Sequence, residues 1–116
     1  PLTNETRHLV NTAFIKACKP GVILINTSRG ACIHTADVVN ALENGDLGGA
    51  CLDVFENEKP PTFSDAEQAL YHRLHQLENV VLTPHIAGWT YESKYLLASV
   101  LLEKITESER VREVRG

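Results

Sequence analysis

Short apolar runs bounded by turn residues are the strongest feature of the hydrophobic pattern. They occupy residues 22–26 (VILIN), 48–54 (GGACLDV) and 80–83 (VVLT). Continuous apolar runs of this length are typical of strands that are buried on both faces. The pattern therefore predicts three buried strands.

Segments with helical character separate these runs. Asn11 or Thr12 can cap a short helix that ends before Pro20. A second helix is predicted to start at Thr35, a candidate N-cap, and to end near Gly45, which suits the C-terminal cap. The apolar side of this second helix consists of Ala36, Val38, Val39, Ala41 and Leu42.

Two further helices complete the pattern. One is predicted over residues 66–76, and the longest begins near residue 90. The apolar residues of the longest helix are Tyr91, Tyr95, Ala98, Leu101, Leu102 and Ile105. Strand and helix thus alternate, which predicts parallel strands joined by right-handed helical crossovers. The expected fold class is α/β, with a doubly wound parallel sheet and a long C-terminal helix.

Composition narrows the class of protein. The chain has 116 residues, of which 43% are hydrophobic, and this is enough for one core. A formal net charge of -4, without a basic run before the C-terminal tail, argues against a nucleic-acid partner. Apolar stretches of membrane length and a secretory signal pattern are both missing from the sequence. We therefore expect a soluble, cytoplasmic protein without a membrane partner.

Cysteine and methionine usage add two expectations. Cys18, Cys32 and Cys51 form no CxxC pair, so they are interpreted as reduced core thiols and no metal site is predicted. The sequence contains no methionine and begins at Pro1 in a loop-like segment. From this we expect a fragment of a longer protein.

Polar residues follow each predicted strand. The first strand leads to Arg29, the second to Asp53, Glu56 and Glu58, and the third to His85. Taken singly, each has an ordinary structural interpretation, such as a loop cation or a solvated carboxylate. Ligands of parallel sheets, however, bind beyond the carboxyl ends of the strands. An arginine that clamps a carboxylate, a histidine that moves a proton and a carboxylate that orients the histidine together suit the reduction of a keto acid.

Several ordered motifs carry a resemblance to a known family. They are NTSRG at residues 26–30, GGACLDVFENEKP at 48–60 and LTPHIAGWT at 82–90. These resemble successive signatures of the NAD-dependent D-2-hydroxyacid dehydrogenases, which include D-3-phosphoglycerate dehydrogenase and glyoxylate/hydroxypyruvate reductase. The resemblance implies that residues 1–116 are the C-terminal half of a Rossmann-like NAD-binding domain, without its GxGxxG half and without the substrate domain.

The resemblance also implies catalytic roles. Arg29 matches the residue that binds the substrate carboxylate, and His85 matches the acid/base. Glu58, five residues after Asp53, matches the partner of the histidine. Glu56 stays open as the alternative, because this chain has Lys59 where family members often have proline directly after the glutamate.

Cofactor contacts follow from the same resemblance, which implies NAD, although the choice between NAD and NADP stays open. The matching positions are Thr27, Ser28, Arg29, Asp53, His85, Ala87 and Gly88, with Pro1 and Thr6 matching more loosely. Small residues at the last two loop positions would let the backbone approach a flat ring closely.

The predicted function is hydride transfer between NAD(H) and a D-2-hydroxy acid or 2-keto acid of unspecified identity. The parent protein is predicted to be a homodimer, and the isolated chain is expected to be inactive. One alternative is a non-catalytic, corepressor-like module that binds a nucleotide, and another is a structural fragment within an assembly. Retention of Arg29, Glu58 and His85 together favours the enzyme, because a scaffold has no need of an acid/base pair.

Overall fold

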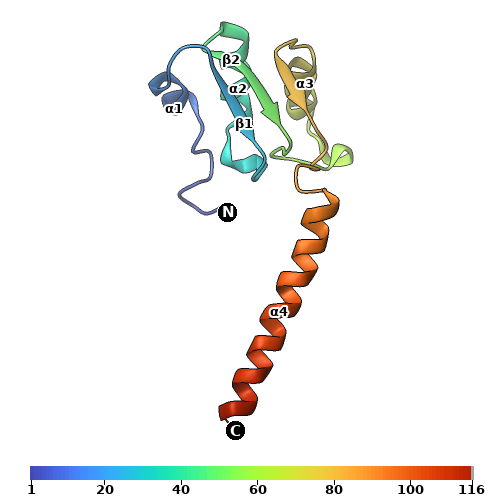
Figure 1. Cartoon of the computed structure of the whole chain (residues 1–116). Coiled ribbons are helices and arrows are strands. Elements are labelled where there is room, and N and C mark those ends of the chain that lie inside the picture. Colours follow the sequence, from blue (N-terminus) through green and yellow to red (C-terminus); the bar gives the residue numbers. More distant parts are fainter. Residues whose placement is uncertain (116) are drawn as a thin grey trace. The chain divides into compact units, whose positions relative to one another are not determined.

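The computed structural model describes the backbone of residues 1–115 and the side chains of residues 1–110. The chain forms two compact units, Pro1–His85 and Ile86–Gly116. In chain order the elements are α1 (Thr12–Ala17), β1 (Val22–Asn26), η1 (Gly30–Cys32), α2 (Thr35–Asn44), β2 (Leu47–Leu52), η2 (Pro60–Thr62), α3 (Asp65–His75), β3 (Val80–Leu82) and α4 (Tyr91–Arg115), as labelled in Figure 1.

The first unit is built on a parallel sheet. Its strand order is β1-β2-β3, and both strand pairs are parallel (Figure 1). Ile25 is aligned with Cys51, which is aligned with Val81 on the third strand. The helices α2 and α3 connect consecutive strands, which confirms the predicted α/β alternation.

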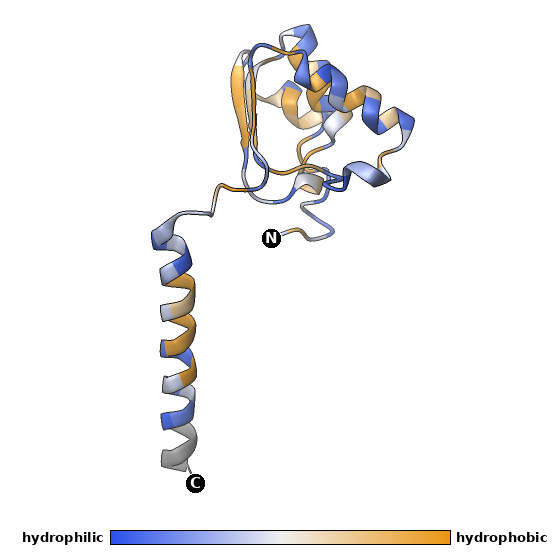
Figure 2. Cartoon of the chain, turned by 90° about the vertical axis from the view of Figure 1, so that its right-hand side faces the viewer, coloured by the Kyte–Doolittle hydropathy of each residue, from blue (hydrophilic) through white to orange (hydrophobic). Residues whose placement is uncertain are grey.

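One face of the sheet carries the core. Figure 2 shows the helices of the first unit on one side of the strands. The buried cluster between them consists of Ile15, Ile33, Val38, Val39, Ala41, Leu42, Leu47, Ala50, Leu52, Tyr71 and Leu74. The predicted apolar side of α2 therefore packs as expected, although Ala36 itself is only half-buried.

The prediction that the strands are buried on both faces is wrong. Ile23 is 61% exposed, Ile25 is 68% exposed and Val81 is 58% exposed. Side chains alternate across a strand, so these residues point to the face that the helices of this unit do not cover. The apolar runs correctly indicated strands, but residue type alone could not show which face of the sheet is covered by helices.

Helix caps were predicted with mixed success. Asn11 caps α1, because its Oδ1 accepts hydrogen bonds from the amides of Ala13 (3.0 Å) and Phe14 (3.1 Å). Gly45 ends α2 with a left-handed φ of 80°, as predicted. Thr35 is not the N-cap of α2 but its first helical residue. The N-cap residue is His34, whose side chain makes no capping hydrogen bond. The Thr35 N–H is accepted instead by Glu56 Oε2 at 2.9 Å.

Helix α3 is fixed at both ends. Ser64 and Glu67 form a capping box at its start, which places the first helical residue at 65 and not at the predicted 66. Near its end, Arg73 forms a two-pronged ion pair with Glu43 of α2, with Nε–Oε1 at 2.9 Å and Nη2–Oε2 at 2.5 Å. Arg73 also donates to Asn40 Oδ1 at 2.8 Å. These contacts anchor α3 to its neighbouring helix.

The second unit contains α4, which begins at Tyr91 close to the predicted position. Its apolar residues gather in the middle turns of the helix (Figure 2). Many are exposed, including Tyr91 (94%), Leu102 (65%) and Ile105 (48%). Among the described residues, the helices are too short or too polar to span a bilayer.

The cysteines deviate slightly from expectation. Cys18, Cys32 and Cys51 are free thiols, but each is half-buried and none lies fully in the core of the described residues. Cys51 lies on the partly uncovered sheet face between Ile25 and Val81, which explains its incomplete burial.

Candidate functional site

The loop after β1 is shaped by Asn26. This side chain is 6% exposed and occupies the last position of the strand. Its Oδ1 accepts the Ser28 N–H at 3.1 Å, and its Nδ2 donates to the Arg29 carbonyl at 3.1 Å. Side-chain amides that bond the following backbone in this way hold tight turns. The loop therefore presents the Arg29 side chain to solvent, where Nη1 donates to the Ser28 carbonyl at 2.7 Å.

Gly30 brings the loops after β1 and β2 into direct contact. A Cβ at this position would lie 1.9 Å from both the carbonyl carbon and the carbonyl oxygen of Phe55. Only glycine allows this approach of two backbones. Arg29 is thereby placed beside the segment that carries Glu58.

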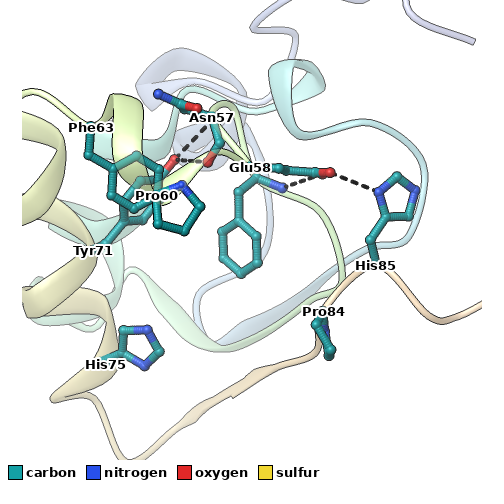
Figure 3. A pocket seen from close by; sticks show the side chains of 9 residues that line it. Asn57, Glu58, Pro60, Phe63, Tyr71, His75, Pro84 and His85 are labelled. Atoms are coloured by element: carbon teal, nitrogen blue, oxygen red, sulfur yellow. Dashed lines mark hydrogen bonds and ion pairs between the residues drawn. The ribbon is translucent and has the colours of Figure 1, made fainter.

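Glu58 and His85 form a hydrogen-bonded pair (Figure 3). Glu58 Oε2 lies 2.9 Å from His85 Nδ1, and Glu58 Oε1 accepts the Phe55 N–H at 3.2 Å. Both carboxylate oxygens of Glu58 are thus engaged. Because Nδ1 of the imidazole faces Glu58, the opposite nitrogen, Nε2, is the atom that can exchange a proton with a ligand.

The charge of Arg29 also acts on the Glu58–His85 pair. The hydrogen bond from His85 lowers the pKa of the Glu58 carboxyl, and desolvation opposes this effect. The Phe55 amide and the charge of Arg29 lower the pKa of Glu58 further. Glu58 is therefore a carboxylate at neutral pH, within electrostatic reach of the guanidinium. The structure thus pairs Glu58 with His85, and the charge of Arg29 acts on Glu58.

The backbone of His85 is held in an uncommon conformation. Its φ is 56°, in the left-handed region that residues other than glycine rarely adopt. The His85 N–H donates to the Asp53 carbonyl at 2.8 Å and to the Thr83 carbonyl at 3.1 Å. Such backbone strain persists only where surrounding contacts impose it, and it often occurs at functional sites.

Asp53 joins the ends of β2 and β3. Its side chain is 3% exposed, and its Oδ1 accepts a hydrogen bond from Thr83 Oγ1 at 2.5 Å. The Asp53 N–H donates to the Asn26 carbonyl at 3.0 Å, which continues the sheet hydrogen bonds toward β1. Asp53 is therefore fixed at the carboxyl edge of the sheet, where its predicted contact with a cofactor would lie.

Glu56, the alternative partner of His85, lies in a different cluster. Its Oε1 is 2.5 Å from His8 Nε2, and its Oε2 caps α2 through Thr35. Both oxygens are committed to these contacts. In the structure it is therefore Glu58, and not Glu56, that pairs with the histidine.

Four other predicted positions, Pro1, Thr6, Ala87 and Gly88, lie in the N-terminal turn and in the loop that follows His85. Thr6 Oγ1 donates to the Pro1 carbonyl at 3.1 Å within an N-terminal turn. Ala87 and Gly88 belong to the second compact unit, where the Gly88 carbonyl accepts a hydrogen bond from Ser93 Oγ. The predicted cofactor contacts at these four positions stay predictions.

A pocket of about 340 Å³ adjoins the Glu58–His85 pair (Figure 3). Its wall includes Phe55, Glu58, Phe63, Tyr71, His75 and His85. The lining is mainly aromatic, and the pair lies at its edge. Within the described residues there is no group of three or more histidine, cysteine or acidic side chains that could hold a metal ion.

Sequence reasoning missed the hydrogen-bonding roles of two residues. Tyr71 lies in the segment that was predicted only as a helix over residues 66–76, yet its hydroxyl bonds to the backbone of Asn57. Asn57 lies directly before Glu58 in the ENEKP segment and was overlooked. The available signal was the position of Asn57 between two candidate glutamates.

Comparison with known proteins identifies the family. A family model described as "D-isomer specific 2-hydroxyacid dehydrogenase, NAD binding domain" matches residues 1–87. The chain belongs to this family. The match confirms the resemblance drawn from the sequence motifs, and it confirms NAD as the cofactor of the family.

Curated members of the family include close relatives of known activity. The chain is 41% identical over 105 residues to the glyoxylate reductase of Thermococcus litoralis, covering 90% of this chain and 29% of that protein. It is 36% identical over 118 residues to the D-specific alpha-keto acid dehydrogenase of Enterococcus faecium, covering 97% of this chain and 37% of that protein.

A solved structure of the family has the same fold. The NAD complex of the D-isomer specific 2-hydroxyacid dehydrogenase of Lactobacillus delbrueckii ssp. bulgaricus matches with a TM-score of 0.78 at 30% identity, over 94% of this chain and 35% of that chain. The likeness confirms the Rossmann-like fold class. The chain spans about a third of the length of the relatives it matches.

Proposed function

We propose that the protein containing these residues is an oxidoreductase that transfers hydride between NAD(H) and a D-2-hydroxy acid or its 2-keto acid. The observation that carries the proposal is the pairing of Glu58 with His85, 2.9 Å apart, beside Arg29 at the carboxyl edge of a parallel sheet. An acid/base pair next to a guanidinium favours an enzyme over a non-catalytic nucleotide-binding module.

The proposal extends beyond the chain itself, which spans about a third of its relatives' length. We propose that residues 1–116 form the C-terminal half of the NAD-binding domain of a homodimeric dehydrogenase. On this proposal, the glycine-rich phosphate-binding turn and the substrate domain are supplied by other residues of the protein. The 116-residue chain alone is then expected to be inactive.

His85 would move the proton. During reduction of a 2-keto acid, Nε2 of the imidazolium donates a proton to the developing alkoxide at C2; during oxidation Nε2 takes the hydroxyl proton. Glu58 holds Nδ1 through the 2.9 Å hydrogen bond, which fixes the orientation of the ring. The Glu58 carboxylate also stabilises the imidazolium form by charge.

Arg29 would bind the substrate. Its planar guanidinium can hold the carboxylate through two parallel hydrogen bonds, and its charge stabilises negative charge that builds on the C2 oxygen. The Asn26 amide and the backbone contact at Gly30 fix the loop that positions it. Arg29, in the loop after β1, would therefore both bind the substrate carboxylate and polarise the C2 carbonyl.

The residues at the sheet edge fit a nicotinamide nucleotide. Thr27 and Ser28 are exposed and carry hydroxyl groups, and Asp53 is a fixed hydrogen-bond acceptor at the same edge. These residues would hold the nicotinamide end of the cofactor. When bound, NAD(H) supplies or accepts the hydride, and the side chains described above supply the proton and the charge stabilisation.

The test compares the wild-type protein with His85→Ala, using NADH absorbance with glyoxylate, pyruvate and hydroxypyruvate as substrates. We expect kcat to fall by about 10²- to 10⁴-fold, the usual contribution of general acid–base catalysis, while NADH affinity is retained. His72→Ala, an exposed histidine of α3, is the matched control and should behave as wild type.

Two results would contradict the proposal. Near-normal turnover of His85→Ala would remove this residue from proton transfer. If the wild-type protein binds NADH but none of the 2-keto acids supports NADH oxidation, the result would favour the regulatory module.

A further inference from the structure

We propose that Tyr71 of α3 and Asn57 are positioning residues that hold Glu58 in place for His85. The inference rests on the proposed function, because it assigns a role to residues that act through the acid/base pair. Neither side chain contacts the imidazole in the described contacts of the pair. Their effect would pass through the backbone that carries Glu58.

Tyr71 clamps the peptide directly before Glu58. Its hydroxyl accepts the Asn57 N–H at 3.2 Å and donates to the Asn57 carbonyl at 3.3 Å. Burial raises the pKa of Tyr71, so the hydroxyl keeps its proton and can donate at neutral pH. One side chain therefore satisfies both backbone groups of the residue adjacent to Glu58.

The ring of Tyr71 is itself held rigidly. It is 9% exposed and packs against Phe55 in an edge-to-face geometry, with ring centroids 5.8 Å apart. The ring of Phe63 also packs against Tyr71, with ring centroids 4.8 Å apart. Aromatic contacts of this kind fix the ring orientation, so the hydroxyl position is set by packing.

The Asn57 side chain extends the support on both sides of Glu58. Its Oδ1 accepts the Lys59 N–H at 3.0 Å, a bond that spans Glu58. Its Nδ2 donates to Glu67 Oε1 at 3.1 Å. The other oxygen of Glu67 accepts the Ser64 N–H at 2.8 Å in the capping box of α3. The Glu58 segment is thus tied to the start of α3.

The Glu58 side chain needs this support because packing does not confine it. The side chain is 39% exposed and borders the pocket of about 340 Å³, so it has room to turn away from His85. Tyr71 stands on another wall of the same pocket (Figure 3). Hydrogen bonds of the loop, and not close packing, therefore hold the Glu58 carboxylate next to the His85 imidazole.

The first test measures the titration of the Glu58 carboxyl by carbon NMR in three forms of the 116-residue chain: the wild type, Tyr71→Phe and Asn57→Ala. The charged groups that face Glu58 are His85 and Arg29. Loosening the loop should weaken the contacts that lower the pKa of Glu58, and the titration midpoint should move up toward its ordinary value. Tyr91→Phe, which removes the same hydroxyl from a 94% exposed residue, is the matched control and should leave the midpoint unchanged.

A second measurement separates positioning from general destabilisation. In the catalytically active protein, Tyr71→Phe is expected to lower kcat by about tenfold, in line with the loss of two hydrogen bonds to part-buried backbone groups, while the KM for NADH stays unchanged. Circular dichroism checks that each variant is folded at the temperature of measurement. If Tyr71→Phe does not fold, Asn57→Ala carries the test.

The outcomes distinguish the two proposals. A Glu58 midpoint in folded Tyr71→Phe and Asn57→Ala equal to that of the wild type would overturn the positioning role. An upward shift in the variants, combined with a His85→Ala enzyme that still turns over, would uphold the positioning of Glu58 and contradict the proposed function instead.

Discussion

Replacing Gly30 by alanine is expected to separate the two loops that form the site. The added Cβ would lie 1.9 Å from the carbonyl carbon and oxygen of Phe55, and 2.5 Å from the Glu56 amide nitrogen. All three atoms belong to the backbone, so no side-chain rotation can relieve the clash. Ordinary contact begins at 3.4 Å, so the loops must separate by about 1.5 Å.

The expected cost of this separation is large for a small unit. Overpacking in a close-packed region costs about 1–3 kcal/mol, and a clash between two backbones belongs at the upper end, near 3 kcal/mol. That is a substantial share of a total stability of about 5–15 kcal/mol. For a unit the size of Pro1–His85, it corresponds to a fall in Tm of roughly 12–24 °C.

Urea unfolding followed by circular dichroism measures this loss directly. Gly88→Ala is the control, because a Cβ there would meet no described atom within 4 Å. We expect a lower urea midpoint for Gly30→Ala and an almost unchanged one for Gly88→Ala. Equal midpoints for Gly30→Ala and wild type would refute the inferred contact between the loops. A folded Gly30→Ala variant should still lose activity, because Arg29 would move away from Glu58.

Two further predictions concern substrate binding and pH. Arg29→Lys should raise the KM for the 2-keto acid by about tenfold or more, because an ammonium cannot form the two-pronged clamp. Steady-state kinetics with an unchanged substrate KM would exclude Arg29 from carboxylate binding. The hydrogen bonds from Ser64 lower the pKa of Glu67 below its ordinary 4.5. These bonds therefore stabilise the folded state fully above pH 4.5, and this stabilisation is lost as the pH falls through the lower pKa of the folded state. Urea unfolding from pH 7 to pH 3 should show a weaker loss of stability for Glu67→Gln than for wild type, and identical acid profiles would contradict the assignment.

Local signals in the sequence were sufficient for much of the fold. Asn11 and Gly45 took the predicted cap positions because caps depend on the backbone of a few adjacent residues. The apolar runs gave the strands, and the parallel pairing placed Arg29 and His85 at the same edge of the sheet. The predicted partner of His85, five residues after Asp53, is the glutamate that contacts it.

Other features depend on residues far apart in the chain. The sequence predicted Thr35 as the N-cap, but the N-cap residue is His34, and the acceptor for the first helical N–H is Glu56, which the loop after β2 carries to the start of α2. The exposure of Ile25 could not be foreseen either, because an apolar residue type does not reveal which face of the sheet has a covering layer. The bonds between Tyr71 and Asn57 likewise require α3 to fold back over the loop.

By itself, the sequence determined the order of strands and helices, the family and the side chains with the chemistry for keto-acid reduction. Hydrophobic periodicity, caps and motifs all operate over short stretches of chain, so they can be recognised without coordinates. Only the tertiary structure decided that Glu58 and not Glu56 faces His85, and that the loops after β1 and β2 touch at Gly30. Those outcomes follow from the three-dimensional path of the loops, which no local pattern specifies.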